Sequence, residues 1–200
     1  MMHERTVEKA LLASQTAVES AGRVEIQTFI GLYDEFFARV YNYVRYRCGD
    51  ATIADDLTAQ TFERALTYLR DFDPQRGSFG SWLFTIARNV INNYLRAEKR
   101  RDVLLIDCCP EQVDRNSDLE DSLVRMETES EILAAVFQLG ERERDLISLK
   151  FAAGFTNRRI AEVTGMTENH VAVVLFRAIR RLRQILDQNY ENHVSTEPDR

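Results

Sequence analysis

The 200-residue sequence contains little proline and glycine, with 3 and 8 residues respectively. Turn-rich β-sandwiches need both residue types at their many turns, so this scarcity disfavours that class and favours helices. Three cysteines are too few, and odd in number, for a disulfide framework in a chain of this length. There is no apolar run of about 18 residues that could cross a membrane, and Met1 to Glu8 are too polar for a signal peptide. We therefore expect a cytoplasmic protein without membrane insertion.

Patterns of catalytic and metal-binding residues are also missing. The sequence has no phosphate-binding glycine loop, no nucleophile elbow and no HExxH zinc motif. His3, His170 and His193 are too widely scattered to form a cluster, and Cys108 and Cys109 have no further Cys or His at ligand spacing. We predict no enzymatic activity, no bound metal and no cofactor.

The formal net charge of −6 is unevenly distributed along the chain. Residues 29–101 and 131–190 each carry a balance of +2, whereas residues 102–130 carry −7. The acidic stretch also has the loose polar composition of a linker. We predict two small domains, 29–101 and 131–190, joined by an acidic flexible linker at 102–130. An N-terminal extension, 1–28, has no predicted role, and a polar tail occupies 191–200.

Hydrophobic periodicity predicts an all-α fold. Apolar residues recur at steps of three and four, and no segment shows the alternation of a strand. In the second helix the apolar stripe includes Leu57, Phe62 and Leu66. Ser81 is a plausible cap for the helix that starts at Trp82. The helices are expected over residues 29–46, 53–69, 82–99, 132–137, 141–151, 157–163 and 167–186.

Residues 160–167 have the pattern of a helix-turn-helix motif. Ala161 is small enough for close helix approach, Gly165 permits the turn, and Thr167 can cap the next helix. That helix is then the candidate for entering a DNA major groove. Its expected core face consists of Val171, Val174, Leu175, Ala178, Leu182 and Ile185. Its opposite face has Asn169, Val173, Phe176, Arg177, Arg180 and Gln184, with His170 at the margin and further basic charge at Arg181 and Arg183. The alternative is a helical hairpin with a solvated basic face.

A second polar stripe follows the helix that starts near Trp82. Basic and amide side chains on one helix face, next to the loop aromatics Phe72 and Phe79, suit single-stranded nucleic acid, because cations hold phosphates and aromatic rings stack on unpaired bases. The alternative is a solvated face over two core phenylalanines. The stripe consists of Thr85, Arg88, Asn92, Arg96 and Lys99, with Asn89 at its margin and Arg100 and Arg101 beyond it.

These motifs, in this order, resemble bacterial sigma factors of the extracytoplasmic-function (ECF) type, group IV of the sigma-70 family. The segment from Asp56 to Ala65 is similar to region 2.2. The pattern Phe79-x-x-Trp82-Leu83-x-x-Ile86-Ala87-Arg88-Asn89 is similar to regions 2.3 and 2.4. The segment from Leu139 to Arg183 is similar to region 4. The resemblance covers nearly two thirds of the chain.

The resemblance implies binding to core RNA polymerase and to promoter DNA. Region 2.2 would dock on the clamp of the β′ subunit through Asp55, Asp56, Gln60, Glu63 and Arg64. The melted −10 element would meet Phe72, Arg76, Ser78, Phe79, Trp82, Thr85, Arg88, Asn89, Asn92, Arg96, Lys99 and Arg100. The −35 duplex would meet Thr167, Asn169, His170, Val173, Arg177, Arg180 and Arg181. Region 4 would also touch the β flap, the acidic linker would occupy the RNA path, and an anti-sigma factor is a further partner that the resemblance allows.

The sequence departs from the family pattern at two functional positions. Gln60 stands where many members have Glu, and residues 172–174 are Ala-Val-Val where many members have Lys, Ser and Arg. Val173 or Phe176 could instead contact a thymine methyl group.

The competing hypothesis is an autonomous helix-turn-helix regulator with a helical sensor or dimerisation domain. The segment from Trp82 to Arg101 argues against it, because such a regulator needs no second nucleic-acid helix. The sequence pI of about 5.2 also argues against tight unaided duplex binding. We therefore expect negligible promoter affinity without core polymerase.

Overall fold

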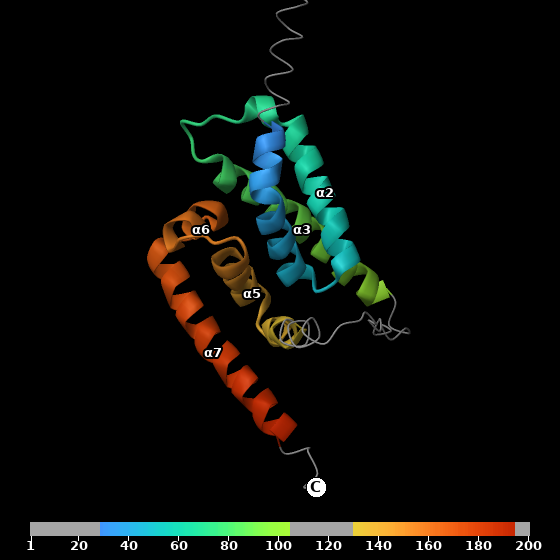
Figure 1. Ribbon diagram of the computed structural model, residues 1–200, viewed down its shortest axis with the longest axis vertical. Helices are drawn as coiled ribbons and strands as arrows, with labels where there is room; N and C mark the ends of the chain where they lie inside the picture. The colour runs from blue at the N-terminus through green and yellow to red at the C-terminus, as the bar shows by residue number, and fades with distance from the viewer. Residues whose placement is uncertain (1–28, 105–129, 195–200) are drawn as a thin grey trace, which may run out of the picture. The chain divides into compact units, whose positions relative to one another are not determined.

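The computed structural model describes residues 29–104 and 130–194 (Figure 1). The extension 1–28, most of the predicted linker with Cys108 and Cys109, and residues 195–200 lie outside the described residues. The chain divides into two compact units, Met1–Ala38 and Arg39–Arg200. The boundaries of the two domains and the linker stay predictions.

The described residues form an all-α fold without strands, as predicted. Residues 29–48 are helical, and α2 (Ala51–Thr67) follows after a short turn. A 3₁₀ turn at Leu69–Asp71 and a loop lead to α3 (Phe79–Leu104). Residues 130–137 form a helix before α5 (Glu141–Ile147), which ends in a π-helical turn at Ser148–Ala152. The last helices are α6 (Asn157–Thr164) and α7 (Glu168–Val194).

Helix α2 packs against α3 around an apolar core. Each apolar side chain buried here contributes about 1.5–3 kcal/mol to folding. Leu57 and Phe62 are buried as predicted, but Leu66 is 50% exposed, so its assignment to the core was wrong. Phe62, one turn before Leu66, and Ala65, directly before it, are the last buried residues of α2, and the Leu66 side chain lies outside the buried face. The core also contains Val40, Tyr43, Val44, Ala54, Leu83, Phe84, Ala87, Val90 and Ile91.

Helices α5, α6 and α7 pack around a second apolar core, since α7 contacts both α5 and α6. On the predicted core face of α7, Val174 and Leu182 are half-buried rather than buried. The fully or nearly fully buried side chains are Leu146, Ile147, Leu149, Ile160, Val163, Val171, Leu175, Ala178 and Ile185.

Side-chain caps fix where the helices begin. Asp50 accepts a hydrogen bond from the Ile53 amide at 2.9 Å at the start of α2. Thr167 accepts one from the His170 amide at 3.3 Å, which confirms its predicted role at α7. The prediction that Ser81 caps α3 was wrong: the helix starts earlier, and the Ser78 hydroxyl accepts from the Ser81 amide at 3.2 Å. Two serines three residues apart both suit a cap, and the helix uses the first.

Candidate nucleic-acid interface

An aromatic cluster lies where the loop after α2 enters α3. The Phe72 and Phe79 rings meet edge to face, with centroids 5.5 Å apart. Trp82 lies 5.3 Å from Phe72 and 5.4 Å from Phe79, centroid to centroid. Such tilted and edge-on contacts are the preferred geometry of aromatic pairs. All three rings remain partly exposed, so they are not the purely internal phenylalanines of the alternative interpretation.

A pocket of about 650 Å³ opens beside this cluster. Its volume is within the usual range of small-molecule sites, about 300–1,000 Å³, and is ample for one base. Five of the predicted −10 residues line it, namely Phe72, Arg76, Ser78, Trp82 and Thr85. Its other walls come from Asp71, Asp73, Gly77 and Ser81, and from Arg159 and Glu162 of α6. The two α6 residues were not predicted, because no pattern in the sequence connects them with this loop.

The predicted polar stripe on α3 contains both exposed and half-buried residues. Thr85, Asn89, Arg96, Lys99 and Arg100 are exposed. Arg88 and Asn92 are half-buried. Arg88 donates to Asp145, and Asn92 accepts a hydrogen bond from Arg47. Most of the stripe is therefore accessible to a ligand, but Arg88 and Asn92 already form hydrogen bonds within the protein.

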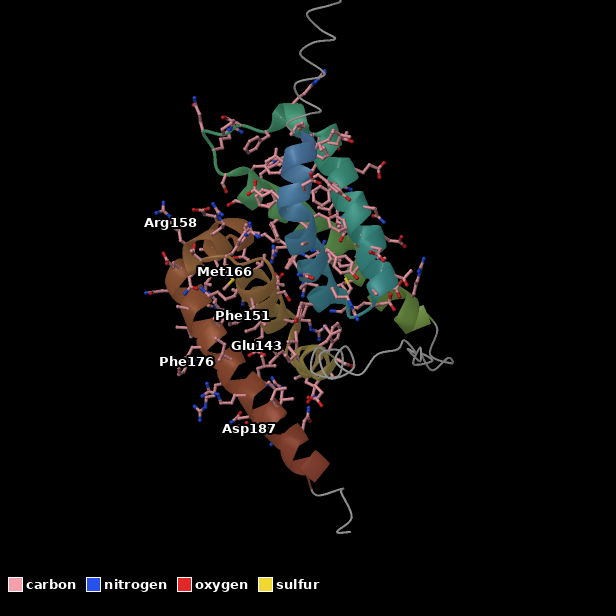
Figure 2. All side chains as sticks on the ribbon, viewed as in Figure 1. Glu143, Phe151, Arg158, Met166, Phe176 and Asp187 are labelled. Carbon is pink, nitrogen blue, oxygen red and sulfur yellow. The ribbon has the colours of Figure 1, made fainter. Side chains whose placement is uncertain are left out.

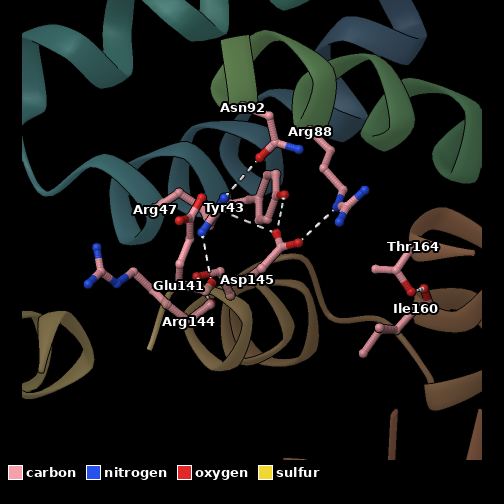
Figure 3. Close-up of polar contacts among 10 residues, drawn as sticks. Tyr43, Arg47, Arg88, Asn92, Glu141, Arg144, Asp145, Ile160 and Thr164 are labelled. Carbon is pink, nitrogen blue, oxygen red and sulfur yellow. Dashed lines mark hydrogen bonds and ion pairs between the residues drawn. The ribbon is translucent and has the colours of Figure 1, made fainter. Parts of the chain in front are cut away.

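The partner of Arg88 is Asp145 on α5 (Figure 3). Arg88 Nε donates to one carboxylate oxygen of Asp145 at 2.8 Å. The Tyr43 hydroxyl donates to the other oxygen at 2.7 Å, and Arg47 Nε lies 3.3 Å from that oxygen. Arg47 also donates to the Asn92 side chain and to the Glu141 carbonyl, both at 3.1 Å. We call Tyr43, Arg47, Arg88 and Asp145 the Asp145 cluster.

Burial shapes the ionisation of the Asp145 cluster. It raises the pKa of the Tyr43 hydroxyl well above 10.0, and the nearby charge of Asp145 raises it further. Burial opposes the charge on Arg88, but the hydrogen bond and the attraction of Asp145 outweigh it and raise the pKa of Arg88. Tyr43 therefore stays neutral and Arg88 stays charged across the physiological pH range.

The predicted polymerase-binding face of α2 is solvent-accessible. Leu66 and Tyr68, 50% and 53% exposed, extend it with apolar surface. Aromatic and apolar side chains among charges are typical of protein interfaces. The predicted residues Asp55, Asp56, Gln60, Glu63 and Arg64 are all exposed.

The turn before α7 has the geometry expected of a helix-turn-helix. Gly165 ends α6 with φ of +71°, in the left-handed region that glycine adopts without strain. Phe176 is 70% exposed on the outer side of α7 (Figure 2), and Val173 is 47% exposed. Arg181 lies 3.7 Å from the Glu143 carboxylate. The predicted −35 residues Thr167, Asn169, His170, Val173, Arg177, Arg180 and Arg181 are all exposed.

A helix-turn-helix with a basic outer face, together with a second helical part that presents an aromatic pocket, defines a nucleic-acid-binding protein of two parts. Residues 32–101 match Sigma-70 region 2, and residues 129–182 match Sigma-70, region 4. The chain belongs to the sigma-70 family and is of the ECF type. The autonomous regulator is thereby not favoured.

Named relatives agree with this family. ECF RNA polymerase sigma factor BldN of Streptomyces coelicolor is 34% identical over 172 residues, 84% of this chain and 64% of BldN, so this chain spans less than two thirds of that relative. ECF RNA polymerase sigma factor SigL of Mycobacterium tuberculosis is 29% identical over 175 residues, 86% of this chain and 96% of SigL.

Solved structures share the fold. A sigma factor RpoE in complex with the anti-sigma factor NepR from Bartonella quintana has a TM-score of 0.68 and 21% identity, covering 80% of this chain and 98% of that one. CnrH in complex with the cytosolic domain of CnrY has a TM-score of 0.61 and 22% identity, covering 81% and 89%. Within the described part of this chain, no helix is long and apolar enough to cross a membrane.

Proposed function

We propose that this protein is a non-catalytic, cytoplasmic initiation factor that binds core RNA polymerase and directs it to specific promoters. The observation that carries the proposal is the presence of two nucleic-acid faces of different kinds in one chain. One is a pocket lined by Phe72 and Trp82, suited to an unpaired base. The other is the exposed basic face of α7, suited to a duplex groove. Promoter opening needs both a melted and a double-stranded contact.

The aromatic pocket suits a base flipped out of the −10 element. Flipping costs a few kcal/mol, and stacking on an aromatic ring returns about 1–3 kcal/mol per base. Trp82 and Phe72 supply the rings, and Arg76 at the rim supplies a cation for a neighbouring phosphate. Asn89, exposed on α3, can hydrogen-bond an adjacent base.

The outer face of α7 suits the −35 duplex. Asn169 and His170 lie at the start of the helix, which is the end that contacts base edges in helix-turn-helix complexes. The exposed arginines further along can hold phosphates on either side of the groove. Val173 and Phe176 present apolar surface that fits thymine methyl groups.

The remaining partners follow from the family and from exposed surfaces. The α2 face described above would dock on the β′ clamp, and region 4 would contact the β flap. The linker 102–130, with its charge of −7, would lie in the RNA path. The solved relatives RpoE and CnrH are each bound to another protein, which supports an anti-sigma factor as a partner of this chain too.

The test is transcription in vitro with sigma-free core polymerase on fragmented genomic DNA, followed by mapping of transcript 5′ ends. We expect discrete starts that share two upstream motifs. Asn89→Ala should abolish or strongly weaken these starts, because it removes a predicted base contact without touching the Asp145 cluster. Asn42→Ala, the same change at an exposed position outside both predicted faces, should leave them intact. A protein that neither initiates nor binds core polymerase would refute the proposal.

A further inference from the structure

Two apolar side chains lie at the centre of the outer face of α7. Val173 is 47% exposed, and Phe176, on the outer side of the helix in Figure 2, is 70% exposed. At about 100° per residue, both project within about 60° of the directions of Asn169 and Arg180. At about 1.5 Å per residue, Val173 and Phe176 are about 4.5 Å apart along the helix axis. We call these two residues the apolar stripe; it lies between an amide and a cation.

The part of α7 around the apolar stripe offers no side-chain hydrogen bond to a base. The six residues from Val171 to Phe176 are Val-Ala-Val-Val-Leu-Phe, and none of their side chains can donate or accept a hydrogen bond. Val171 and Leu175 are buried in the core, which fixes the helix with the apolar stripe facing outward. The early turns of the second helix are the part of a helix-turn-helix that reaches base edges. Base reading by these turns therefore depends on contacts between apolar groups.

Thymine is the standard base that presents an apolar group, its C5-methyl, at the edge of the major groove. The other bases present only hydrogen-bond donors and acceptors there. If Val173 or Phe176 covered one of these polar groups, the group would lose its water without gaining a protein partner, which disfavours binding. The apolar stripe therefore favours thymine by contact and disfavours the other bases by desolvation.

The charges beside the apolar stripe identify its occupant as a DNA duplex. Exposed apolar side chains alone would also suit a protein surface, but cations on the same helix face fit the phosphates that border a major groove. These exposed basic residues are Arg177, Arg180, Arg181 and Arg183.

We propose that the apolar stripe reads two thymines of the −35 element through their C5-methyl groups, without hydrogen bonds to those bases. This inference rests on the proposed function and deepens it, because it names the chemical group that α7 recognises. The axial separation of about 4.5 Å between Val173 and Phe176 compares with about 3.4 Å between successive base pairs, so the two side chains reach neighbouring pairs. Either strand can carry the thymines, since the methyl group projects into the major groove from both.

The first test removes the methyl groups and leaves base pairing unchanged. A promoter found in the transcription assay is rebuilt from synthetic strands with deoxyuridine in place of the thymines of its −35 element. We expect the holoenzyme concentration for half-maximal initiation to rise about fourfold per methyl contact, and so roughly 15-fold for two, while the maximal rate stays the same. The same replacement in the spacer between the two promoter elements is the control and should change neither quantity.

The converse substitution adds a methyl group. Cytosine in place of one of the two thymines should weaken binding, and 5-methylcytosine at that position should recover about fourfold, because its methyl group lies at the same place in the groove. Cytosine and 5-methylcytosine pair with guanine in the same way, so the difference between them reports the methyl contact alone.

The second test assigns the methyl contacts to residues. Val173→Ala shortens the apolar stripe and should reduce the uracil effect from roughly 15-fold to about fourfold. Ile179→Ala is the matched control, because Ile179 is also an exposed apolar residue of α7 but projects about 90° around the helix from the apolar stripe. It should keep the full uracil effect. Both positions are exposed, so neither change leaves a cavity in the core.

The outcomes separate this inference from the proposed function. Equal initiation from the thymine and uracil promoters overturns methyl reading and leaves the sigma function standing. An undiminished uracil effect in both Val173→Ala and Phe176→Ala does the same, because the methyl groups are then contacted elsewhere. If Val173→Ala weakens binding to purified core polymerase and changes nothing on DNA, the apolar stripe is a protein-docking surface and the inference fails. A protein that neither initiates nor binds core polymerase refutes both proposals.

Discussion

Arg47 shows how a single residue can link segments that are distant in sequence. Its guanidinium is buried: the two terminal nitrogens donate to the Asn92 amide oxygen and to the Glu141 carbonyl, and Nε lies 3.3 Å from the Asp145 carboxylate as an ion pair, without a hydrogen bond. Burial of an arginine without such partners would cost several kcal/mol. In the sequence, Arg47 is only a charge near a helix end, and nothing marks its partners, of which Asn92 is 45 residues and Glu141 94 residues further along.

Cys48, the neighbour of Arg47, should react slowly as a thiol. Burial disfavours its thiolate and, against the attraction of Arg47 and Arg144, raises the pKa from 9.0 to about 11. A shift of this size leaves roughly 100-fold less thiolate at neutral pH than an ordinary cysteine has. In the Cys108→Ser, Cys109→Ser chain we expect the rate of alkylation by iodoacetamide to rise with pH toward about 11.

The raised pKa of the Cys48 thiol also makes the stability of the fold fall at alkaline pH. Because its folded pKa lies above its unfolded pKa, it stabilises the fold fully below about pH 9 and loses that contribution as pH rises toward about 11. The same chain unfolded in urea serves as the reference and should alkylate with an ordinary thiol profile. If the alkylation rate of the folded chain has its inflection at or below pH 9, the raised pKa of Cys48 is contradicted.

At the scale of elements, hydrophobic periodicity predicted which segments are helical but not where each helix begins and ends. The seven expected helices all occur. A stripe of apolar residues can be recognised within one segment, and in the fold that stripe packs into the core. Helix starts were less certain, as Ser78 and Ser81 show, since both serines can cap and tertiary packing selects one. The helix predicted over 141–151 ends as an α-helix at Ile147 and continues as a π turn, for which the sequence has no recognisable signal.

The turn of the helix-turn-helix depends on one glycine. Gly165 has φ of +71°, and a Cβ added to it would meet no atom within 4 Å, so a side chain there would suffer from backbone strain alone. Left-handed backbone costs other residues about 1–2 kcal/mol. Gly165→Ala should therefore destabilise the protein by about 1 kcal/mol in urea denaturation followed by circular dichroism. Gly77→Ala, with open space and no positive φ, is the matched control and should change stability little; equal effects of the two would contradict the argument.

On the scale of the whole molecule, some parts of the candidate site lie within one segment of the sequence, and others form only where two distant segments meet. The exposed face of α7 follows from helical periodicity within its own segment, and the exposed residues of α2 were predicted from the family resemblance of a single segment. The pocket walls at Arg159 and Glu162, and the contacts of Tyr43 and Asp145, arise only where distant segments meet. Tyr43 is buried like the apolar residues around it, but its hydroxyl donates to Asp145, a polar role that hydrophobic patterning does not detect.

The contacts between residues 39–104 and 141–145 combine two kinds of ion pair with different sensitivity to salt. Lys99 and Glu141 are exposed, and their hydrogen bond lowers the pKa of Glu141 even though partial burial opposes this. The Asp145 cluster is mostly buried. Salt shortens the screening length from about 10 Å at 0.1 M to about 3 Å at 1 M, and buried pairs are screened much less than exposed ones.

We therefore expect the buried contacts between these two segments to survive high salt. In a chain with spin labels at Gln75→Cys and Gln184→Cys, both exposed positions, and with the three native cysteines changed to Ser, the distance distribution at 1 M NaCl should match that at 0.1 M. The reason is that the Asp145 cluster and the contact between the buried Phe84 and Phe155 rings hold the segments together. Lys99→Met should change it little at either concentration, since exposed pairs contribute only about 0–1 kcal/mol. If the distribution instead broadens steadily with salt, exposed charges rather than the buried Asp145 cluster hold the two segments together.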